Sequence, residues 1–217
     1  MLKLIIGNKN YSSWSLRPWL LLKQAQIPFE EVLIPLYEAG SRERTLAYSP
    51  TGKVPCLIDG DIVVWDSLAI SEYLAECFPE RQLWPAAMAD RAEARAIAAE
   101  MHAGFTYLRG QMPMNLRRER PRLSKAPEVE QDIARIISIW SALRQRHAGA
   151  GDFLFGSFSV ADAMYAPVVT RFKSYDVKLP ALAQQYADTV LALPAMQEWY
   201  AAGRAESWRI AVSELDD

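Results

Sequence analysis

A polar loop followed by the first helix is predicted within the stretch Asn8-Lys-Asn-Tyr-Ser-Ser-Trp-Ser-Leu-Arg-Pro-Trp-Leu-Leu-Leu22. Three serines, Ser12, Ser13 and Ser15, stand where the polar loop becomes an apolar helical run. Serine is a favoured N-cap because its oxygen accepts one of the free N–H groups of the first helical turn. The same N–H groups and the positive end of the helix dipole favour an anion. The stretch therefore predicts a helix cap or an anion site, and the remaining sequence has to decide between them.

Extended segments and helices alternate over the first 80 residues. Strands are expected at 2–6, 29–34, 56–58 and 62–65. The first two strands flank a helix, as in a parallel βαβ unit, whereas Asp59-Gly60 between the last two is a strong signal for an antiparallel hairpin. A helix then starts at Asp66-Ser67 and carries one apolar stripe. This order predicts an α/β layer of the thioredoxin-like kind.

Strand signals end before residue 90, and the rest of the chain reads as helical. Residues 90 to about 120 predict one long helix, weakened near Pro113. Further on, Ser159-Val-Ala-Asp162 is a capping box that opens another helix. We expect a thioredoxin-like domain at 1–80, a linker at 81–89 and an all-helical domain at 90–217.

Composition excludes several classes of function. A chain of 217 residues, 51% of them hydrophobic, can bury a sizeable core. The formal net charge of -2 gives no basic footprint for nucleic acid. No apolar run reaches the roughly 18 residues of a membrane span, and the one before Gly7 is too short for a signal peptide. We therefore expect a cytoplasmic protein with no nucleic-acid or membrane partner.

Cysteine and histidine are scarce, which argues against metal and redox chemistry. Cys56 and Cys77 have neither CxxC spacing nor a nearby histidine. The only histidines are His102 and His147, too few for a typical zinc site. No metal is expected.

Four motifs together resemble glutathione transferases over nearly the whole chain: Ser12-Ser13-Trp14-Ser15, Lys53-Val54-Pro55, Asp66-Ser67 and Ser159-Val-Ala-Asp162. The resemblance implies the glutathione transferase fold, an α/β thioredoxin-like N-terminal domain followed by an all-α C-terminal domain. It also implies glutathione as co-substrate, a small electrophile as second substrate, and a homodimer.

Among the classes of this family, the chain is most similar to zeta-like, serine-type enzymes, which include maleylacetoacetate isomerases. Their first loop reads Ser-Ser-Cys-Ser, and their helical domain carries Ala-Asp, a proline and Arg-Phe-Lys. The matching residues here are Ala161-Asp162, Pro167 and Arg171-Phe172-Lys173.

The resemblance assigns glutathione-binding roles in the N-terminal half. It implies that Pro55 follows a cis bond and that Val54 offers its backbone N–H and C=O to the cysteinyl part of glutathione. Asp66 and Ser67 would hold the γ-glutamyl carboxylate at a helix N-terminus. Lys53 would face the glycyl carboxylate.

The reaction needs a thiolate, since the thiolate and not the thiol is the nucleophile. A hydrogen bond to a charged acceptor contributes about 1.5 to 3 kcal/mol, and a helix N-terminus about 0.3 to 1. At about 1.36 kcal/mol per unit, these two effects lower a thiol pKa by roughly 1.5 to 3 units, without a general base. The catalytic serine of the family falls on Ser12, with Ser13 as the competitor and Ser15 expected to cap the helix. Tyr11 is a further possible donor.

A second-substrate pocket is predicted from residues that would share a face if 90 to 120 formed one helix: His102, Phe105, Arg109, Met112 and Asn115. Trp14 stands where zeta-class enzymes have a cysteine, which disfavours a cysteine-dependent thiol reductase. The function predicted is conjugation of glutathione to a small electrophile. The alternatives are a glutathione-dependent isomerase of the maleylacetoacetate or maleylpyruvate type, and a non-catalytic interaction module.

Overall fold

A four-stranded mixed sheet forms the N-terminal part of the computed structural model, which describes residues 1–119 and 126–214. The strands are β1 (Leu2–Ile6), β2 (Phe29–Leu33), β3 (Cys56–Asp59) and β4 (Ile62–Trp65), in the order β2-β1-β3-β4. β1 is parallel to β2, and β3 is antiparallel to both β1 and β4. The predicted βαβ unit and hairpin are both confirmed.

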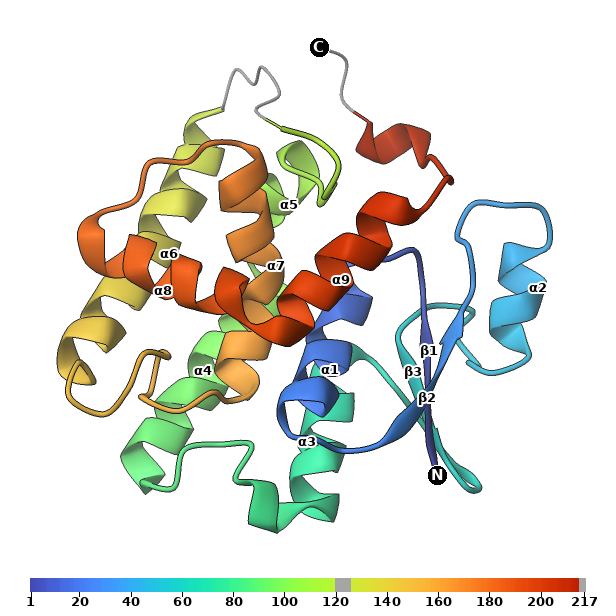
Figure 1. Ribbon diagram of the computed structural model, residues 1–217, viewed down its shortest axis with the longest axis horizontal. Coiled ribbons are helices and arrows are strands. Elements are labelled where there is room, and N and C mark those ends of the chain that lie inside the picture. Colours follow the sequence, from blue (N-terminus) through green and yellow to red (C-terminus); the bar gives the residue numbers. More distant parts are fainter. Residues whose placement is uncertain (120–125, 215–217) are drawn as a thin grey trace.

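Three helices accompany the sheet: α1 (Ser13–Gln24), α2 (Ser41–Leu46) and α3 (Ser67–Cys77). α1 and α3 pack against each other and lie between the sheet and the helices of the C-terminal half (Figure 1). The apolar stripe of α3 is buried at Ile70 and Leu74, as its spacing predicts.

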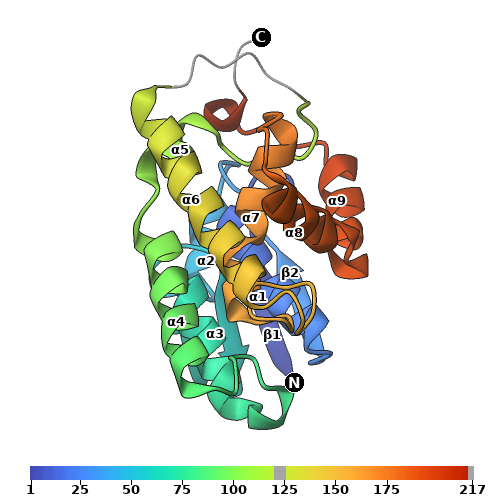
Figure 2. The ribbon, with the colours of Figure 1, turned by 90° about the vertical axis from the view of Figure 1, so that its left-hand side faces the viewer.

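The C-terminal half is helical: α4 (Met88–Ala103), α5 (Thr106–Gln111), α6 (Pro127–Arg146), α7 (Val160–Ser174), α8 (Ala181–Ala192) and α9 (Pro194–Ala205). Two short 3₁₀ turns cover 79–81 and 211–213. α7 is buried along nearly its whole length and packs on both α1 and α4. Seen from the side, the sheet lies behind these helices (Figure 2). The α/β-then-all-α fold class is therefore confirmed.

One hydrophobic core joins the two halves. Trp19 of α1 and Trp199 of α9 meet edge to face with ring centroids 5.0 Å apart. The boundaries predicted for two domains, at 1–80 and 90–217, stay a prediction; α4 begins inside the expected linker. None of the helices within 1–119 and 126–214 is both long and apolar enough to cross a membrane.

The prediction of a single helix from 90 to about 120 is wrong. α4 ends at Ala103, and α5 starts three residues later. A Cβ at Gly104 would lie 2.8 Å from the backbone oxygen of Glu100, and Phe105 has a φ of 54°. The chain therefore changes direction at 104–105, well before the proline that was expected to weaken the helix.

Candidate active site

A cavity of about 500 Å³ opens between the loop before β3, the start of α3 and the end of α4. This volume falls within the range of about 300 to 1,000 Å³ found for small-molecule sites. Its wall is made by Trp14, Thr51, Lys53, Val54, Pro55, Trp65, Asp66, Ser67 and His102. All five glutathione-binding residues predicted from sequence are thus brought to one cavity.

The Val54–Pro55 peptide bond is cis, as the resemblance implied. Pro55 is buried and leads directly into β3, whereas Val54 is half-buried. Among hydrogen bonds within the described residues, none uses the backbone N–H or C=O of Val54. Both groups are free to pair with a peptide-like ligand in the manner of a strand.

Asp66 and Ser67 form the N-terminus of α3. Asp66 is the N-cap, with one carboxylate oxygen accepting the N–H groups of Leu68 at 2.9 Å and Ala69 at 3.2 Å. Within the part of the chain that the structure describes, the Ser67 N–H has no partner. The Ser67 hydroxyl oxygen accepts from Arg17 at 3.5 Å, which leaves its proton for a ligand. These donors suit a carboxylate.

His102 of α4 closes the cavity from the helical half. Its Nε2 lies 2.6 Å from the second carboxylate oxygen of Asp66, and its ring meets the Trp14 ring edge to face at 5.5 Å. The prediction placed His102 in the second-substrate pocket, and the structure places it on the same wall as Asp66. A residue from each half therefore shapes one site.

The loop before α1 shows that Ser12, and not Ser15, caps the helix. The helix begins at Ser13, so Ser12 occupies the N-cap position and its oxygen accepts the Ser15 N–H at 3.4 Å. Ser15 Oγ instead accepts the Gly7 N–H at 3.0 Å and the Ser12 hydroxyl at 2.8 Å. Ser12 and Ser13 are buried and lie outside the cavity lining, next to Trp14.

Replacing Ser12 by alanine is expected to lower the free energy of unfolding by about 1 kcal/mol, because an N-cap is lost. Denaturant unfolding measures this change. Ser12→Asn supplies another capping oxygen and should recover much of it. A loss from Ser12→Asn as large as that from Ser12→Ala would contradict the capping role.

Comparison with known proteins identifies the family. Residues 11–77 match the model for the glutathione S-transferase N-terminal domain, and residues 126–202 match that for the C-terminal domain. The chain belongs to the glutathione transferase superfamily.

The chain is similar to a probable maleylacetoacetate isomerase and to two proteins described as zeta class. A "Probable maleylacetoacetate isomerase" of Vibrio cholerae is 28% identical, over 91% of this transferase and 95% of that relative. A zeta-class glutathione S-transferase of Euphorbia esula is also 28% identical, over 79% and 78%. A bacterial maleylpyruvate isomerase, described as zeta class, superposes with a TM-score of 0.72 at 24% identity, covering 95% of this chain and 100% of that one.

Three arginines gather behind the cavity wall of this transferase. Arg17 of α1 and Arg171 of α7 are almost fully buried, and Arg109 of α5 is half-buried. The Arg17 and Arg109 guanidinium carbons lie 4.3 and 5.2 Å from the Trp14 ring centroid. Burial, and then the charge of the other two arginines, lowers the pKa of Arg17 to about 9. None of the three forms an ion pair with a carboxylate of the described residues.

The cavity wall also contains residues that no sequence motif predicted. These are Thr51, Trp65 and Trp14, the last of which stands out in the sequence only as a departure from the zeta-class loop. Arg17 carried a usable signal, since it is a charged residue inside the apolar run that α1 buries.

The predicted second-substrate residues do not share one helix face, because α4 and α5 are separate. Phe105 and Met112 are buried in the core. Asn115 is buried too, with its side chain bonded to Asn10 at 3.0 Å. Arg109 donates to the backbone oxygen of His102 at 2.9 Å. Of the five, only His102 lines the cavity, and the second-substrate role stays a prediction.

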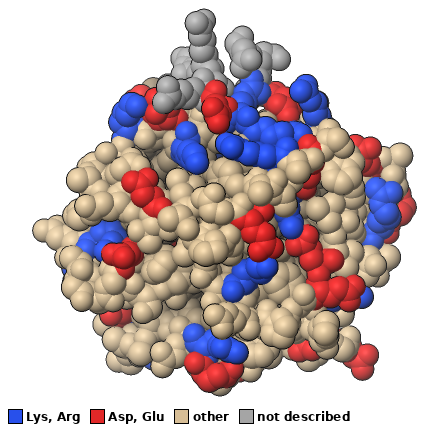
Figure 3. All heavy atoms as spheres, viewed as in Figure 1, with Lys and Arg blue, Asp and Glu red and all other residues tan. Residues whose placement is uncertain are grey.

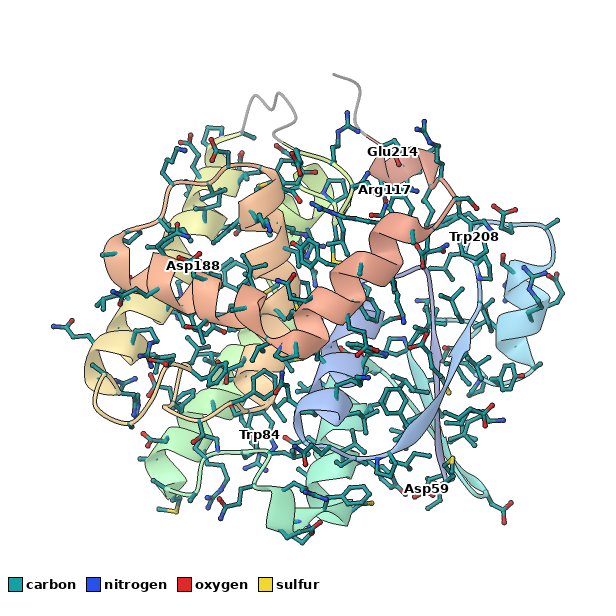
Figure 4. All side chains as sticks on the ribbon, viewed as in Figure 1. Asp59, Trp84, Arg117, Asp188, Trp208 and Glu214 are labelled. Carbon is teal, nitrogen blue, oxygen red and sulfur yellow. The ribbon has the colours of Figure 1, made fainter. Side chains whose placement is uncertain are left out.

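The C-terminal segment of the transferase holds the loop that precedes Ser12. The Glu206 carboxylate accepts the backbone N–H groups of Lys9 at 2.6 Å and Asn10 at 3.1 Å. Arg117 donates to the hydroxyl of Tyr11 and to the backbone oxygens of Glu206 and Trp208. Arg117, Trp208 and Glu214 lie together near this loop (Figure 4).

The tyrosine of this loop is tied into the same contacts. Tyr11 donates its hydroxyl to Glu214 and is 8% exposed. Like Ser12 and Ser13 it does not line the cavity, and its hydroxyl proton is already given to a carboxylate, so the structure gives no support to a tyrosine-type mechanism. On the face shown in Figure 3, Lys and Arg side chains gather at the upper edge.

Proposed function

We propose that this glutathione transferase binds glutathione in the 500 Å³ cavity and activates its thiol as a thiolate for attack on a small electrophile. The proposal rests on one observation. Backbone groups of Val54 and Ser67 that have no partner among the described residues lie on the walls of the same cavity. A purely structural module would not need either set to be free.

The cavity walls suit the three parts of glutathione. The Val54 backbone would pair with the cysteinyl residue, and the N–H and hydroxyl of Ser67 would bind the γ-glutamyl carboxylate. The Asp66 carboxylate, already in contact with His102, is available to the γ-glutamyl ammonium group. Lys53 is exposed at the rim and would attract the glycyl carboxylate.

In the proposed reaction the bound thiol loses its proton to solvent, and the sulfur keeps the electron pair. The thiolate then forms a bond to an electrophilic carbon. In a substitution a leaving group departs with the electrons of its bond; in an addition the π electrons of the double bond move away from the attacked carbon, and the product takes up a proton from solvent. Hydrogen bonds and the positive charge near α1 stabilise the thiolate, which increases its fraction at neutral pH.

A glutathione-dependent isomerase is the second candidate. It is favoured by the similarity to a probable maleylacetoacetate isomerase and to the structure of a maleylpyruvate isomerase. There the thiolate would add to a double bond, rotation would follow, and the thiolate would leave again. Both reactions need the same bound thiolate.

Ultraviolet difference titration of bound glutathione tests the proposal, because a thiolate absorbs where a thiol does not. We expect binding, and a thiol pKa at least one unit below the usual value of about 8.5. S-methylglutathione is the matched control, since it fills the same cavity without a titrating thiol. Binding with an unshifted thiol pKa would favour the non-catalytic module, and no binding would refute the proposal.

We also infer that the enzyme is a cytoplasmic homodimer, because most oligomers of one chain are twofold dimers and the family resemblance points the same way. Light scattering after size-exclusion chromatography would give the mass. A monomer at working concentrations would contradict the dimer.

A further inference from the structure

The loop before α1 is held by a residue from the other end of the chain. Lys9 and Asn10 are buried, and their backbone N–H groups are donated to the two carboxylate oxygens of Glu206, at 2.6 and 3.1 Å. Glu206 is half-buried and directly follows α9. Among the hydrogen bonds of the described residues, neither amide has another backbone acceptor. One carboxylate therefore satisfies two consecutive buried donors, each of which is costly to leave without a partner.

Backbone hydrogen bonds join this loop to the wall of the glutathione cavity. The backbone oxygen of Asn8 accepts the N–H groups of Tyr11 at 3.1 Å and Ser12 at 2.8 Å. The backbone oxygen of Tyr11 accepts the Ser13 N–H at 3.0 Å. Trp14 follows in the first turn of α1 and lines the cavity. A loop released from its C-terminal acceptor would therefore shift the start of α1 and the part of the wall that Trp14 forms.

The contact depends on the charge of Glu206. An ionised carboxylate is an acceptor at both oxygens, whereas a protonated one becomes a donor at one of them. Burial raises the pKa of Glu206 above its ordinary value of 4.5, and the two amides and the positive charges of Arg117 and Lys9 oppose this shift. Protonation of Glu206 therefore weakens its hold on the loop. The charged and titratable groups of the elements packed around the contact are Lys9, Tyr11, Glu31, Arg117, Arg118, Arg204 and Glu214.

We propose that Glu206 is a positioning residue of the glutathione site, which holds the loop and the first turn of α1 in the conformation that binds glutathione. This inference rests on the proposed function. Glu206 is not among the described residues that line the cavity, so it acts through the Lys9 and Asn10 amides and then through Trp14. A protein whose loop is released part of the time binds its ligand more weakly, in proportion to the fraction of molecules in the competent state.

Calorimetric titration with glutathione compares wild type with Glu206→Gln at about pH 7.5. Glutamine has nearly the same shape, but its side-chain NH2 group opposes one of the two amides and cannot accept it. We expect the dissociation constant to rise about three- to tenfold, which corresponds to a competent fraction of about one third to one tenth. Circular dichroism checks that the variant is folded.

Glu198→Gln is the matched control. Glu198 also lies on α9, and its carboxylate pairs with Lys23, in the last turn of α1, at 2.8 Å. The variant therefore removes the same kind of charge from the same pair of helices, but away from the loop before α1. Because exposed ion pairs contribute little, its dissociation constant should stay within about twofold of that of wild type.

The pH dependence separates positioning from a general loss of packing. The quantity measured is the dissociation constant of Glu206→Gln divided by that of wild type, so that titration of His102 and Asp66, which both proteins share, cancels. We expect this ratio to fall towards one as the pH is lowered from about 7.5 to 4.5, because wild-type Glu206 takes up a proton over this interval. A packing defect would keep the ratio constant and would contradict the inference.

A double variant tests the route through Trp14. If Glu206 acts on the part of the wall that Trp14 forms, Glu206→Gln should change the dissociation constant less in a Trp14→Ala background than in wild type, since coupled effects are not additive. Equal changes in the two backgrounds would contradict this route and with it the inference.

Two further outcomes would overturn the inference: unchanged affinity in Glu206→Gln at about pH 7.5, and an equal loss of affinity in Glu198→Gln. If Glu206→Gln does not fold, Glu206→Asp tests the same contact, because it keeps the charge and shortens the reach to the two amides by one methylene. Its dissociation constant should then rise, and an unchanged value would count against Glu206. Failure of the wild type to bind glutathione would instead refute the proposed function.

Discussion

Replacing Ser67 by alanine is expected to raise the dissociation constant of glutathione roughly ten- to a hundredfold. The Ser67 hydroxyl lies in the cavity wall, and its proton has no acceptor among the described residues. A hydrogen bond to a charged carboxylate contributes about 1.5 to 3 kcal/mol, and each 1.4 kcal/mol is a factor of ten in affinity. Isothermal titration calorimetry with glutathione measures the change.

Ser71→Ala is the matched control for that variant. Ser71 lies one turn later on α3, is fully buried, and donates to the backbone oxygen of Ser67 at 2.9 Å, but it does not line the cavity. It should change stability more than affinity. Equal dissociation constants for Ser67→Ala and wild type would place the γ-glutamyl carboxylate elsewhere.

Replacing Asp162 by alanine is expected to lower the free energy of unfolding by about 3 kcal/mol or more, the largest stability loss predicted here. Asp162 is fully buried at the start of α7 and accepts the N–H groups of Leu154 at 3.0 Å and Ser159 at 2.8 Å. It also accepts the Ser159 hydroxyl. Each buried donor left without a partner costs about 1 to 3 kcal/mol. Thermal and denaturant unfolding measure the loss.

Asp162→Asn is the matched control, because it keeps an acceptor and removes the charge. Burial raises the pKa of Asp162 to about 6, above its ordinary value of 3.8. An acid whose pKa is raised on folding makes the protein more stable as the pH falls from above 6 towards 4. The stability of wild type relative to Asp162→Asn should therefore rise over this interval, and no pH dependence in the difference would contradict the shift.

Short-range patterns predicted the α/β part of the fold well. The β3–β4 hairpin turns at Asp59-Gly60, as predicted, and regularly spaced apolar side chains of α3 are buried in the core. The break between α4 and α5 was missed because its cause is a backbone conformation. Phe105 adopts positive φ, which favours glycine in general and which no local pattern indicates.

The sequence predicted those parts of the candidate site that a single short motif supplies. Val54-Pro55 and Asp66-Ser67 line the cavity because each lies at the end of a short element, so their placement depends on few other residues. The contact between Arg171 and Ser13 was not predictable, since it joins residues 158 positions apart through the packing of α7 on α1.

The hydrogen bonds from Lys9 and Asn10 to Glu206 affect the order in which the chain reaches its final structure during synthesis. The loop that leads to Ser12 is translated well before the acceptor for its amides, because Glu206 follows Lys9 by 197 residues and Asn10 by 196. Gly203 also approaches this loop so closely that a Cβ there would lie 3.1 Å from the Asn10 nitrogen. The loop before α1 can therefore make these contacts only after α9 and the residue that follows it have been translated and have packed on the N-terminal half.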